Sequence, residues 1–322
     1  MRQYFGILVA LLTSVSAQSS VRHLCDKEVE ARQSAALFVG VRNFNDSRVA
    51  PVPYAIDDAV DLAYELSIGR KPHLVPPDRV IVALSAGLPV KPESCRKLKA
   101  LLAAGALRRP AGRPEILELL DRQSRRVGRD GVLIVTFATH GVSAADTQYL
   151  LASSSAIDHE ETAISQMTIS DIVSRHDVTR ALILIDACRE NLRRDRRPGQ
   201  PDARSKAAFI RVMIGVEGQV VISGAARGGY AYDDDQRRNG VFTAAVIDAL
   251  QCAAPKDHRG FVTVEKMYSY VSRQVLRWVR NNRNKTARRA TQLSCEGQMG
   301  KMPLSICRRV SRTASASQLH SD

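Results

Sequence analysis

Two stretches decide the fold: residues 132–140 read VLIVTFATH, and residues 181–189 read ALILIDACR. Each begins with a nearly continuous apolar run of strand length, which is typical of parallel sheets that are buried on both faces. His140 ends the first stretch, and Cys188 comes near the end of the second. Because ligand sites of parallel α/β sheets lie beyond the carboxyl ends of the strands, both side chains project into one region if the two strands are neighbours.

Similar apolar runs alternate with helical patterns along most of the chain. This alternation predicts an α/β fold, with a mostly parallel central sheet of about six strands and helices on both faces. Apolar residues at helical spacing mark the helices, and Ser170 is predicted to cap the one that ends near residue 176. Further strands are expected at residues 35–41, 80–84 and 220–223, and helices at 56–67, from 114 onward, 170–176, 242–250 and 264–278.

The composition is that of a folded, strongly basic protein. The chain has 322 residues, of which 44% are hydrophobic, and this is enough for one sizeable core. Its formal net charge of +14 invites a nucleic-acid or anionic-surface partner. No aromatic-rich nucleic-acid motif accompanies the charge, so a solvated basic surface explains it at least equally well, and no nucleic-acid partner is expected.

The first residues have the three parts of an export signal: Arg2 is positively charged, residues 5–12 are apolar, and small residues precede Gln18. An uncleaved membrane anchor is the alternative, but the apolar run is well short of the roughly 20 residues that span a bilayer. We therefore expect export to the periplasm or the extracellular space, with no membrane span in the mature form. The predicted organisation is a signal peptide at residues 1–17, an N-terminal lead at 18–34, one domain at 35–307 and a disordered tail at 308–322.

Export also affects how the six cysteines are interpreted. Thiols outside the cytosol tend to pair, so with Cys188 set aside we expect two disulfides and one leftover thiol, without a pairing scheme. No C-x-x-C or metal-type histidine spacing occurs, and no metal site is predicted. The remaining five cysteines are Cys25, Cys95, Cys252, Cys295 and Cys307.

Cys188 and His140 together suit nucleophilic catalysis. A thiol attacks a carbonyl group as the thiolate, so it needs a nearby base, and the departing amine then needs an acid. One imidazole can serve both steps. Gly141 leaves room for a substrate backbone, and its N–H, together with that of Cys188, is the candidate donor to the oxyanion.

Several segments, in this order, resemble the caspase and metacaspase superfamily, in particular bacterial caspase-like peptidases. His140 precedes Cys188 by 48 residues, and the spacing in caspases is about 50. The resemblance implies a three-layer caspase-like fold and an endopeptidase with a Cys188/His140 dyad and no metal or organic cofactor, although calcium activation is compatible with it. The segments are ALFVGVRNF at 36–44, YAIDDAVDLA at 54–63, DACREN at 186–191, NGVFT at 239–243 and GFVTVEKMYSYV at 260–271.

The resemblance also bears on specificity. Caspases cut after Asp and carry Gln two residues before the nucleophile, whereas metacaspases cut after Arg or Lys and carry Asp there, and this chain has Asp186. Aligning residues 226–233 with the caspase pocket strand puts Asp233 where caspases have an arginine. We therefore predict that Asp186 and Asp233 line the pocket for a basic residue of a protein or peptide substrate. The alternatives are that Asp186 bonds the backbone of the strand-end turn and that residues 233–235 form a solvated acidic loop.

A basic loop follows Cys188, where caspases have their inter-subunit linker. Its arginines make it a candidate self-cleavage loop, and an uncut solvated loop is the alternative. A catalytically silent caspase-like binding module with a basic, partner-recruiting surface is the second hypothesis for the whole chain. Serine hydrolases, zinc proteases and nucleotide-binding proteins are disfavoured because their motifs are missing from the sequence. The candidate cleavage residues are Arg193, Arg194, Arg197 and Arg204.

Overall fold

The computed structural model describes residues 28–69, 72–144, 147–156, 159–187, 190–191, 219–224, 231–283, 294–297 and 301–307. Its centre is a seven-stranded sheet in the order β14-β10-β8-β4-β1-β2-β3. Six of these strands are parallel, and β14 pairs antiparallel with β10 at one edge. The strands are β1 (Ala35–Gly40), β2 (Val80–Leu84), β3 (Leu107–Pro110), β4 (Leu133–Ala138), β8 (Ala181–Asp186), β10 (Gln219–Ser223) and β14 (Ser294–Gly297).

The strand order creates a switch point in the middle of the sheet. The chain starts at β1, runs outward through β2 to β3, and then returns to the other side of β1 to build β4, β8 and β10. In open parallel sheets, ligands bind beyond the carboxyl ends of the strands at such a point. The region after β1, β4 and β8 is therefore the place where this topology favours a site.

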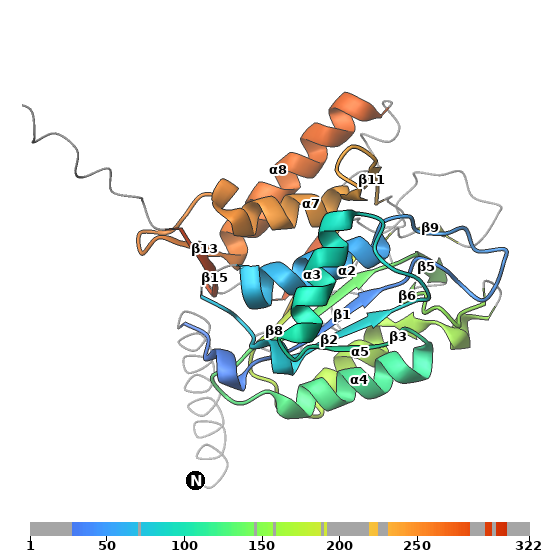
Figure 1. The fold of residues 1–322 in the computed structure, drawn as a ribbon, viewed down its shortest axis with the longest axis horizontal. Helices are drawn as coiled ribbons and strands as arrows, with labels where there is room; N and C mark the ends of the chain where they lie inside the picture. The colour runs from blue at the N-terminus through green and yellow to red at the C-terminus, as the bar shows by residue number, and fades with distance from the viewer. Residues whose placement is uncertain are drawn as a thin grey trace, which may run out of the picture.

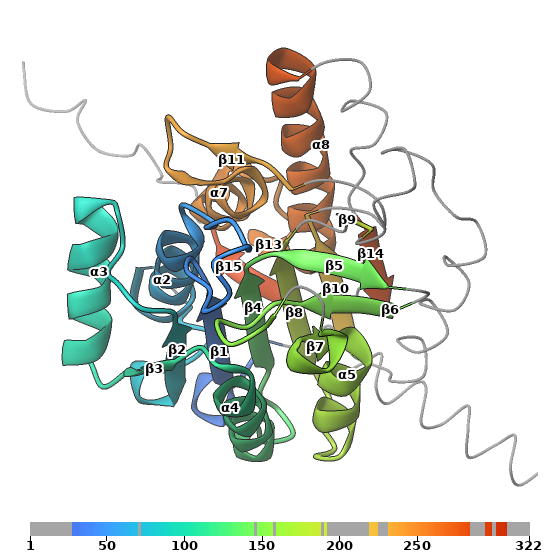
Figure 2. The ribbon, with the colours of Figure 1, turned by 90° about the vertical axis from the view of Figure 1, so that its right-hand side faces the viewer.

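Helices cover both faces of the sheet, as Figures 1 and 2 show. The first face is covered by α2 (Ala55–Tyr64), α3 (Pro92–Ala103), α7 (Val241–Asp248) and α8 (Val264–Asn282). The second is covered by α4 (Arg113–Arg126) and α5 (Gln166–Ser174). Side chains alternate between the two cores along each strand, so Phe38 of β1 packs on the first face and Leu37 on the second. The predicted α/β fold, with about six mostly parallel strands and helices on both faces, is confirmed.

Three smaller sheets surround the carboxyl ends and the C-terminal region. One has the order β7-β6-β5-β9 and consists of β5 (Gly141–Ala144), β6 (Thr147–Leu150), β7 (Ile164–Ser165) and β9 (Glu190–Asn191). The others pair β11 (Asp233–Asp234) with β12 (Asn239–Gly240), and β13 (Phe261–Thr263) with β15 (Pro303–Ile306). Short helical turns complete the structure at Ala31–Gln33, Glu65–Gly69, Pro77–Arg79, Glu160–Thr162 and Ala249–Ala253.

The predicted cap of α5 is wrong. The helix begins at Gln166, and its N-cap is Ser165, whose Oγ accepts a hydrogen bond from the Thr168 N–H at 3.0 Å. Ser170 lies inside the helix and is buried. The buried apolar spacing that marks this helix begins only at Ile169, because Met167 in the first turn is exposed, and the sequence pattern therefore placed the start too late.

One disulfide lies at the C-terminal end of the domain. Cys252, after α7, is bonded to Cys307, after β15. Cys95 is a free thiol, and Cys25 lies outside the described residues. The predicted signal peptide (1–17) and tail (308–322) also lie outside them. None of the helices in the described part of the chain combines the length and apolar character that crossing a bilayer needs.

Candidate active site

β4 and β8 stay paired up to their carboxyl ends, just before the candidate catalytic residues. Ala138 lies opposite Asp186, and the Thr139 N–H donates to the Asp186 carbonyl oxygen at 3.2 Å. His140 follows directly and is partly exposed. Cys188, two residues after Asp186, lies outside the described residues, and so does the candidate self-cleavage loop with Arg193, Arg194, Arg197 and Arg204. The two strand ends are thus side by side and in register.

The imidazole of His140 is held by the loop between β1 and α2. Its Nε2 lies 2.8 Å from the carbonyl oxygen of Ala50, and its ring stacks on Phe44 with the ring centroids 5.5 Å apart. A carbonyl oxygen only accepts hydrogen bonds, so this contact requires a proton on Nε2. The neutral ring therefore carries its lone pair on Nδ1, and this is the nitrogen that remains to act as a base.

The N–H of Gly141 faces away from β6. Gly141 lies opposite Leu150, and the neighbouring Leu151 N–H donates to the His140 carbonyl at 2.9 Å. In an antiparallel ladder this register leaves no hydrogen bond within the pair of Gly141 and Leu150. The Gly141 N–H therefore points toward the other side of β5, where β9 pairs with it in parallel. The first residue of β9 is the second after Cys188 in the chain.

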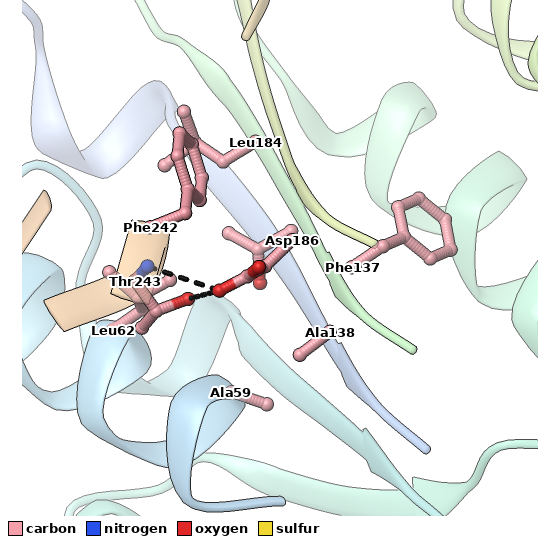
Figure 3. A pocket seen from close by; sticks show the side chains of 9 residues that line it. Ala59, Leu62, Phe137, Ala138, Leu184, Asp186, Phe242 and Thr243 are labelled. Atoms are coloured by element: carbon pink, nitrogen blue, oxygen red, sulfur yellow. Dashed lines mark hydrogen bonds between the residues drawn. The ribbon is translucent and has the colours of Figure 1, made fainter. Parts of the chain in front are cut away.

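Asp186 ends β8 beside Thr243, which lies in the first turn of α7 (Figure 3). Its Oδ2 accepts hydrogen bonds from the N–H of Thr243 at 3.1 Å and from the Thr243 hydroxyl at 2.7 Å. The residue is only 9% exposed, and the space that it lines with Phe137, Phe242 and other apolar side chains is too small for a water molecule. Burial raises the pKa of Asp186 to about 6, against the opposing effect of the Thr243 bonds. Among the described residues, the hydrogen-bond partner of this carboxylate is therefore Thr243 of α7, and the alternative, a bond to the turn that follows β8, involves residues 188–189 outside that part of the chain.

A second buried carboxylate, which sequence reasoning missed, lies beside Asp186. Asp58 of α2 accepts hydrogen bonds from Asn239 Nδ2 at 2.7 Å and from the Gly240 N–H at 3.1 Å. A Cβ atom on Gly240 would stand 2.1 Å from Oδ2 of Asp186 and 3.2 Å from Oδ2 of Asp58, so only glycine fits between the two carboxylates. Burial, followed by the charge of Asp186, raises the pKa of Asp58 well above its usual value.

Asp233 joins the same group of carboxylates. It lies in β11 directly opposite Gly240 and is partly buried. Burial, and then the charge of Asp235, raise the pKa of Asp233 to about 6. Its own charge raises the pKa values of both Asp58 and Asp186. The structure thus brings the predicted pair, Asp186 and Asp233, together with Asp58 around Gly240, and we refer to these three carboxylates as the acidic cluster.

Among the described residues, no cation pairs with the acidic cluster, in contrast to Asp57 and Asp61, the other buried aspartates of α2. Asp57 is paired with Arg42 at 3.3 Å, and Asp61 is paired with Lys91 and with Lys97, the latter at 3.3 Å. Burial alone would raise the pKa of Asp61, but Lys91, Lys97 and the Ser94 hydroxyl together outweigh it, and the pKa is lowered. Within the described ranges, no lysine or arginine forms an ion pair with a member of the acidic cluster.

In the part of the chain that the structure describes, no group of three or more His, Cys, Asp or Glu side chains is arranged to hold a metal ion.

The two residues that follow Asp233 in the expected acidic loop, Asp234 and Asp235, have hydrogen-bond partners of their own. The Trp278 indole N–H donates to Asp234 at 3.2 Å, and the Tyr54 hydroxyl donates to Asp235 at 2.9 Å. The acidic segment 233–235 is therefore folded against the domain and is not simply a solvated loop.

A six-stranded parallel sheet with this switch point, and with a histidine just beyond one of its central strands, defines a caspase-like α/β protein. The sequence matches the model of the caspase domain family (Peptidase C14) over residues 33–302, and the chain therefore belongs to this family of cysteine peptidases. The resemblance on which the sequence prediction relied is thus confirmed.

Solved structures agree with this assignment at the level of the fold. Caspase-1 from Spodoptera frugiperda is similar with a TM-score of 0.55 at 14% sequence identity, over 89% of this chain and 95% of that one. A structural-genomics target protein from Geobacter sulfurreducens is similar with a TM-score of 0.52 at 12% identity, over 86% of this chain and 100% of that one. No curated protein matches the sequence.

Proposed function

We propose that the protein is an endopeptidase that cleaves peptide bonds after Arg or Lys, with Cys188 as nucleophile and His140 as its acid and base. The observation that carries this proposal is the register of β4 and β8, in which Ala138 lies opposite Asp186. His140 and Cys188 each come two residues after a member of this pair. Neighbouring parallel strands end at the same edge of a sheet, so residues at these positions are suited to act on one substrate.

In the proposed reaction, Nδ1 of His140 removes the thiol proton of Cys188, and the thiolate attacks the carbonyl carbon of the scissile bond. The Nε2–H bond to Ala50 supports this role, because it leaves Nδ1 as the basic nitrogen. The Gly141 N–H is a donor to the resulting oxyanion. When the C–N bond breaks, the amine takes its proton from His140, and water, deprotonated by the same imidazole, then hydrolyses the thioester.

The acidic cluster supports the preference for a basic residue. Burial disfavours the charged forms of Asp186 and Asp233 and raises the pKa of each to about 6, so a guanidinium or ammonium group that approaches the cluster from the partly exposed Asp233 is favoured over a neutral side chain. Asp58 adds a third carboxyl group to the same place. An acidic substrate side chain would meet like charges and is disfavoured.

Three further expectations belong to the proposal. The proposed chemistry requires no metal or organic cofactor, and calcium activation is compatible with it. Arg193, Arg194, Arg197 and Arg204 are candidate sites of self-cleavage, since they match the proposed specificity. The expected location of the mature protein is outside the cytosol, after removal of residues 1–17.

The test is hydrolysis of matched peptides with Arg, Lys or Asp before the scissile bond, by protein that begins at Gln18, with and without calcium. We expect cleavage of the Arg and Lys peptides and loss of at least about 1,000-fold in kcat/KM in Cys188→Ala and His140→Ala. A thiol probe is the second readout, because only a thiolate at Cys188 labels quickly at neutral pH. Preferred cleavage of the Asp peptide would refute the specificity, and slow labelling without any hydrolysis would refute the activity.

A further inference from the structure

An arginine and two aromatic rings meet on the other side of β11 from the acidic cluster. Consecutive residues of a strand point to opposite sides. Asp233 faces the acidic cluster, whereas its neighbours Tyr232 and Asp234 contact Trp278 of α8. Figure 1 shows β11 beside the C-terminal half of α8. The short strand β11 thus has the acidic cluster on one side and an aromatic pair with an arginine on the other.

The rings of Tyr232 and Trp278 are tilted relative to each other, and the guanidinium group of Arg283 lies close to both. The ring centroids of Tyr232 and Trp278 lie 5.9 Å apart, and the ring planes are tilted by 32°. The guanidinium carbon of Arg283 lies 5.2 Å from the Tyr232 centroid and 4.8 Å from the Trp278 centroid. Both distances are within the roughly 6 Å at which a cation is attracted to the face of an aromatic ring.

A carboxylate adds charge to the same group. An oxygen of Asp234 accepts a hydrogen bond from the indole N–H of Trp278 at 3.2 Å, and the carboxylate also accepts from two backbone N–H groups of the turn that follows it. We refer to Tyr232, Trp278 and Asp234 as the aromatic cage. Two ring faces with a fixed carboxylate at the edge of one ring are suited to bind a planar guanidinium group.

The side chain of Arg283 also contacts the helix that carries Trp278, because its Nη1 donates to the carbonyl oxygen of Asn282, the last residue of α8, at 3.2 Å. Arg283 is exposed and is the first residue after α8, and its backbone N–H closes the helix by donating to the Val279 carbonyl at 2.9 Å. The helix is held to the core by its apolar stripe, which includes Met267, Val271 and Val275. Buried apolar contacts therefore seat the helix, while the guanidinium group of Arg283 fills the aromatic cage and bonds the last carbonyl group of α8.

We propose that the aromatic cage is a binding subsite for a second arginine of a substrate, and that Arg283 fills it as an internal competitor in the free protein. Tyr232 and Asp233 are consecutive, so their Cα atoms are about 3.8 Å apart, and an extended peptide covers only roughly 3.3 Å per residue. A substrate with its first basic residue in the acidic cluster would therefore reach the cage with another residue only a few positions away. The link to substrates depends on the proposed function, whereas binding of a guanidinium to the cage does not.

The chain has one tryptophan, and it is Trp278 itself, so the tryptophan emission reports directly on the cage. The measurement is a titration of Cys188→Ala protein with Nα-acetyl-arginine amide, followed by this emission, with the neutral analogue Nα-acetyl-citrulline amide as the control ligand. With Arg283→Ala added, we expect a saturable change with the arginine ligand only, and an apparent Kd at least about tenfold lower than with Arg283 present, because a tethered competitor acts at a high effective concentration.

Matched variants separate the cage from other effects. Arg280→Ala removes an exposed arginine of α8 for which the structure shows no cage contact, and it should leave the titration unchanged. Tyr232→Leu in the Arg283→Ala background should abolish the arginine response, and Asp186→Asn should preserve it, since the acidic cluster lies on the other side of β11. The proposal is overturned if folded Arg283→Ala protein, checked by circular dichroism, gives no arginine-specific response, or if the citrulline ligand gives the same change.

A substrate series tests the second half of the proposal. Peptides with one arginine at the cleavage site are compared with peptides that carry a second arginine one to four positions away. In Arg283→Ala, kcat/KM should rise by about tenfold for the best two-arginine peptide, through KM, and stay within about twofold for the one-arginine peptide. Equal effects on both peptides would overturn the role in substrate binding. If no peptide is cleaved at all, the proposed activity fails, while the emission titration still decides whether the cage binds a guanidinium.

Discussion

Replacing Asp186 with Asn should stabilise the fold at neutral pH while it impairs the proposed activity. Burial raises the pKa of Asp186 from 3.8 to about 6. A carboxyl group with a raised pKa contributes stability below its unfolded-state pKa and loses that contribution as the pH rises through its folded-state pKa. At pH 7.5 the ionised Asp186 therefore lowers the free energy of unfolding by about 3 kcal/mol, which corresponds to about two pKa units at 1.36 kcal/mol each.

The neutral amide of asparagine removes this penalty and keeps an oxygen that can accept from Thr243. In Cys188→Ala protein we expect Asp186→Asn to raise the free energy of unfolding by about 1–3 kcal/mol at pH 7.5, since part of the gain is offset by a weaker hydrogen bond. At pH 4, where Asp186 is protonated in the folded state, the change should be within about 0.5 kcal/mol. Urea unfolding at both pH values measures this difference, and Asp171→Asn, an exposed carboxylate on α5, is the matched control.

The same substitution in protein with an intact Cys188 should lower kcat/KM for Arg peptides by about 30-fold or more, mostly through KM, because a partner of the bound cation is lost. Labelling of Cys188 by a thiol probe should remain fast. Equal stability changes at both pH values, or a loss of stability at pH 7.5, would refute the view that burial of the ionised Asp186 destabilises the fold.

Gly240→Ala should destabilise the protein by about 1–3 kcal/mol in urea, because the new Cβ would stand 2.1 Å from a carboxylate oxygen of Asp186, and an unchanged unfolding midpoint would contradict this packing. The charge of Asp233 raises the pKa of Asp186, so Asp233→Asn should lower that pKa. For Arg peptides, kcat/KM is expected to fall below about pH 6, and in this variant the fall should occur at lower pH. An unchanged pH profile would argue against an effect of Asp233 on the pKa of Asp186. Replacing Cys252 and Cys307 together with Ser should lower the free energy of unfolding by about 4 kcal/mol, since the bridge spans 55 residues, and equal stability of variant and parent would show that the bridge does not constrain the unfolded chain.

The central sheet could be predicted from the sequence because its strands are buried on both faces. β4 and β8 are nearly continuous apolar runs, and β2 was expected with its observed bounds, Val80–Leu84. The edge strand β3 was missed, since Leu107–Pro110 contains two arginines and is partly exposed, which leaves no strand pattern. The helix α3 was missed for a similar reason: only Ser94, Leu98 and Leu101 are buried in it.

The position of His140 just after a buried strand could be predicted from the sequence, and its catalytic role stays a prediction. Asp58 could not be identified in this way. Its hydrogen-bond donors are Asn239 and Gly240, which lie 181 and 182 residues away in the chain, and its own surroundings in the sequence are those of an ordinary helix start. A hint was available, because Asp57, Asp58 and Asp61 are unusually many carboxylates for a helix that is buried along most of its length. The partners of each one depend on the tertiary structure.

β8 and β10 are neighbours in the central sheet but are separated in the chain by residues 187–218. This arrangement determines how a break in that segment would affect the protein. The two strands lie next to each other in the central sheet and pair along five residues, so a cut between residues 192 and 218 would leave each fragment with strands of the same sheet. The C-terminal fragment would also keep α7 and α8 packed in the core that α2 shares. A nicked protein should therefore run as two bands on a denaturing gel and elute as one species under native conditions, with the chain opened beside the proposed nucleophile and the domain still assembled.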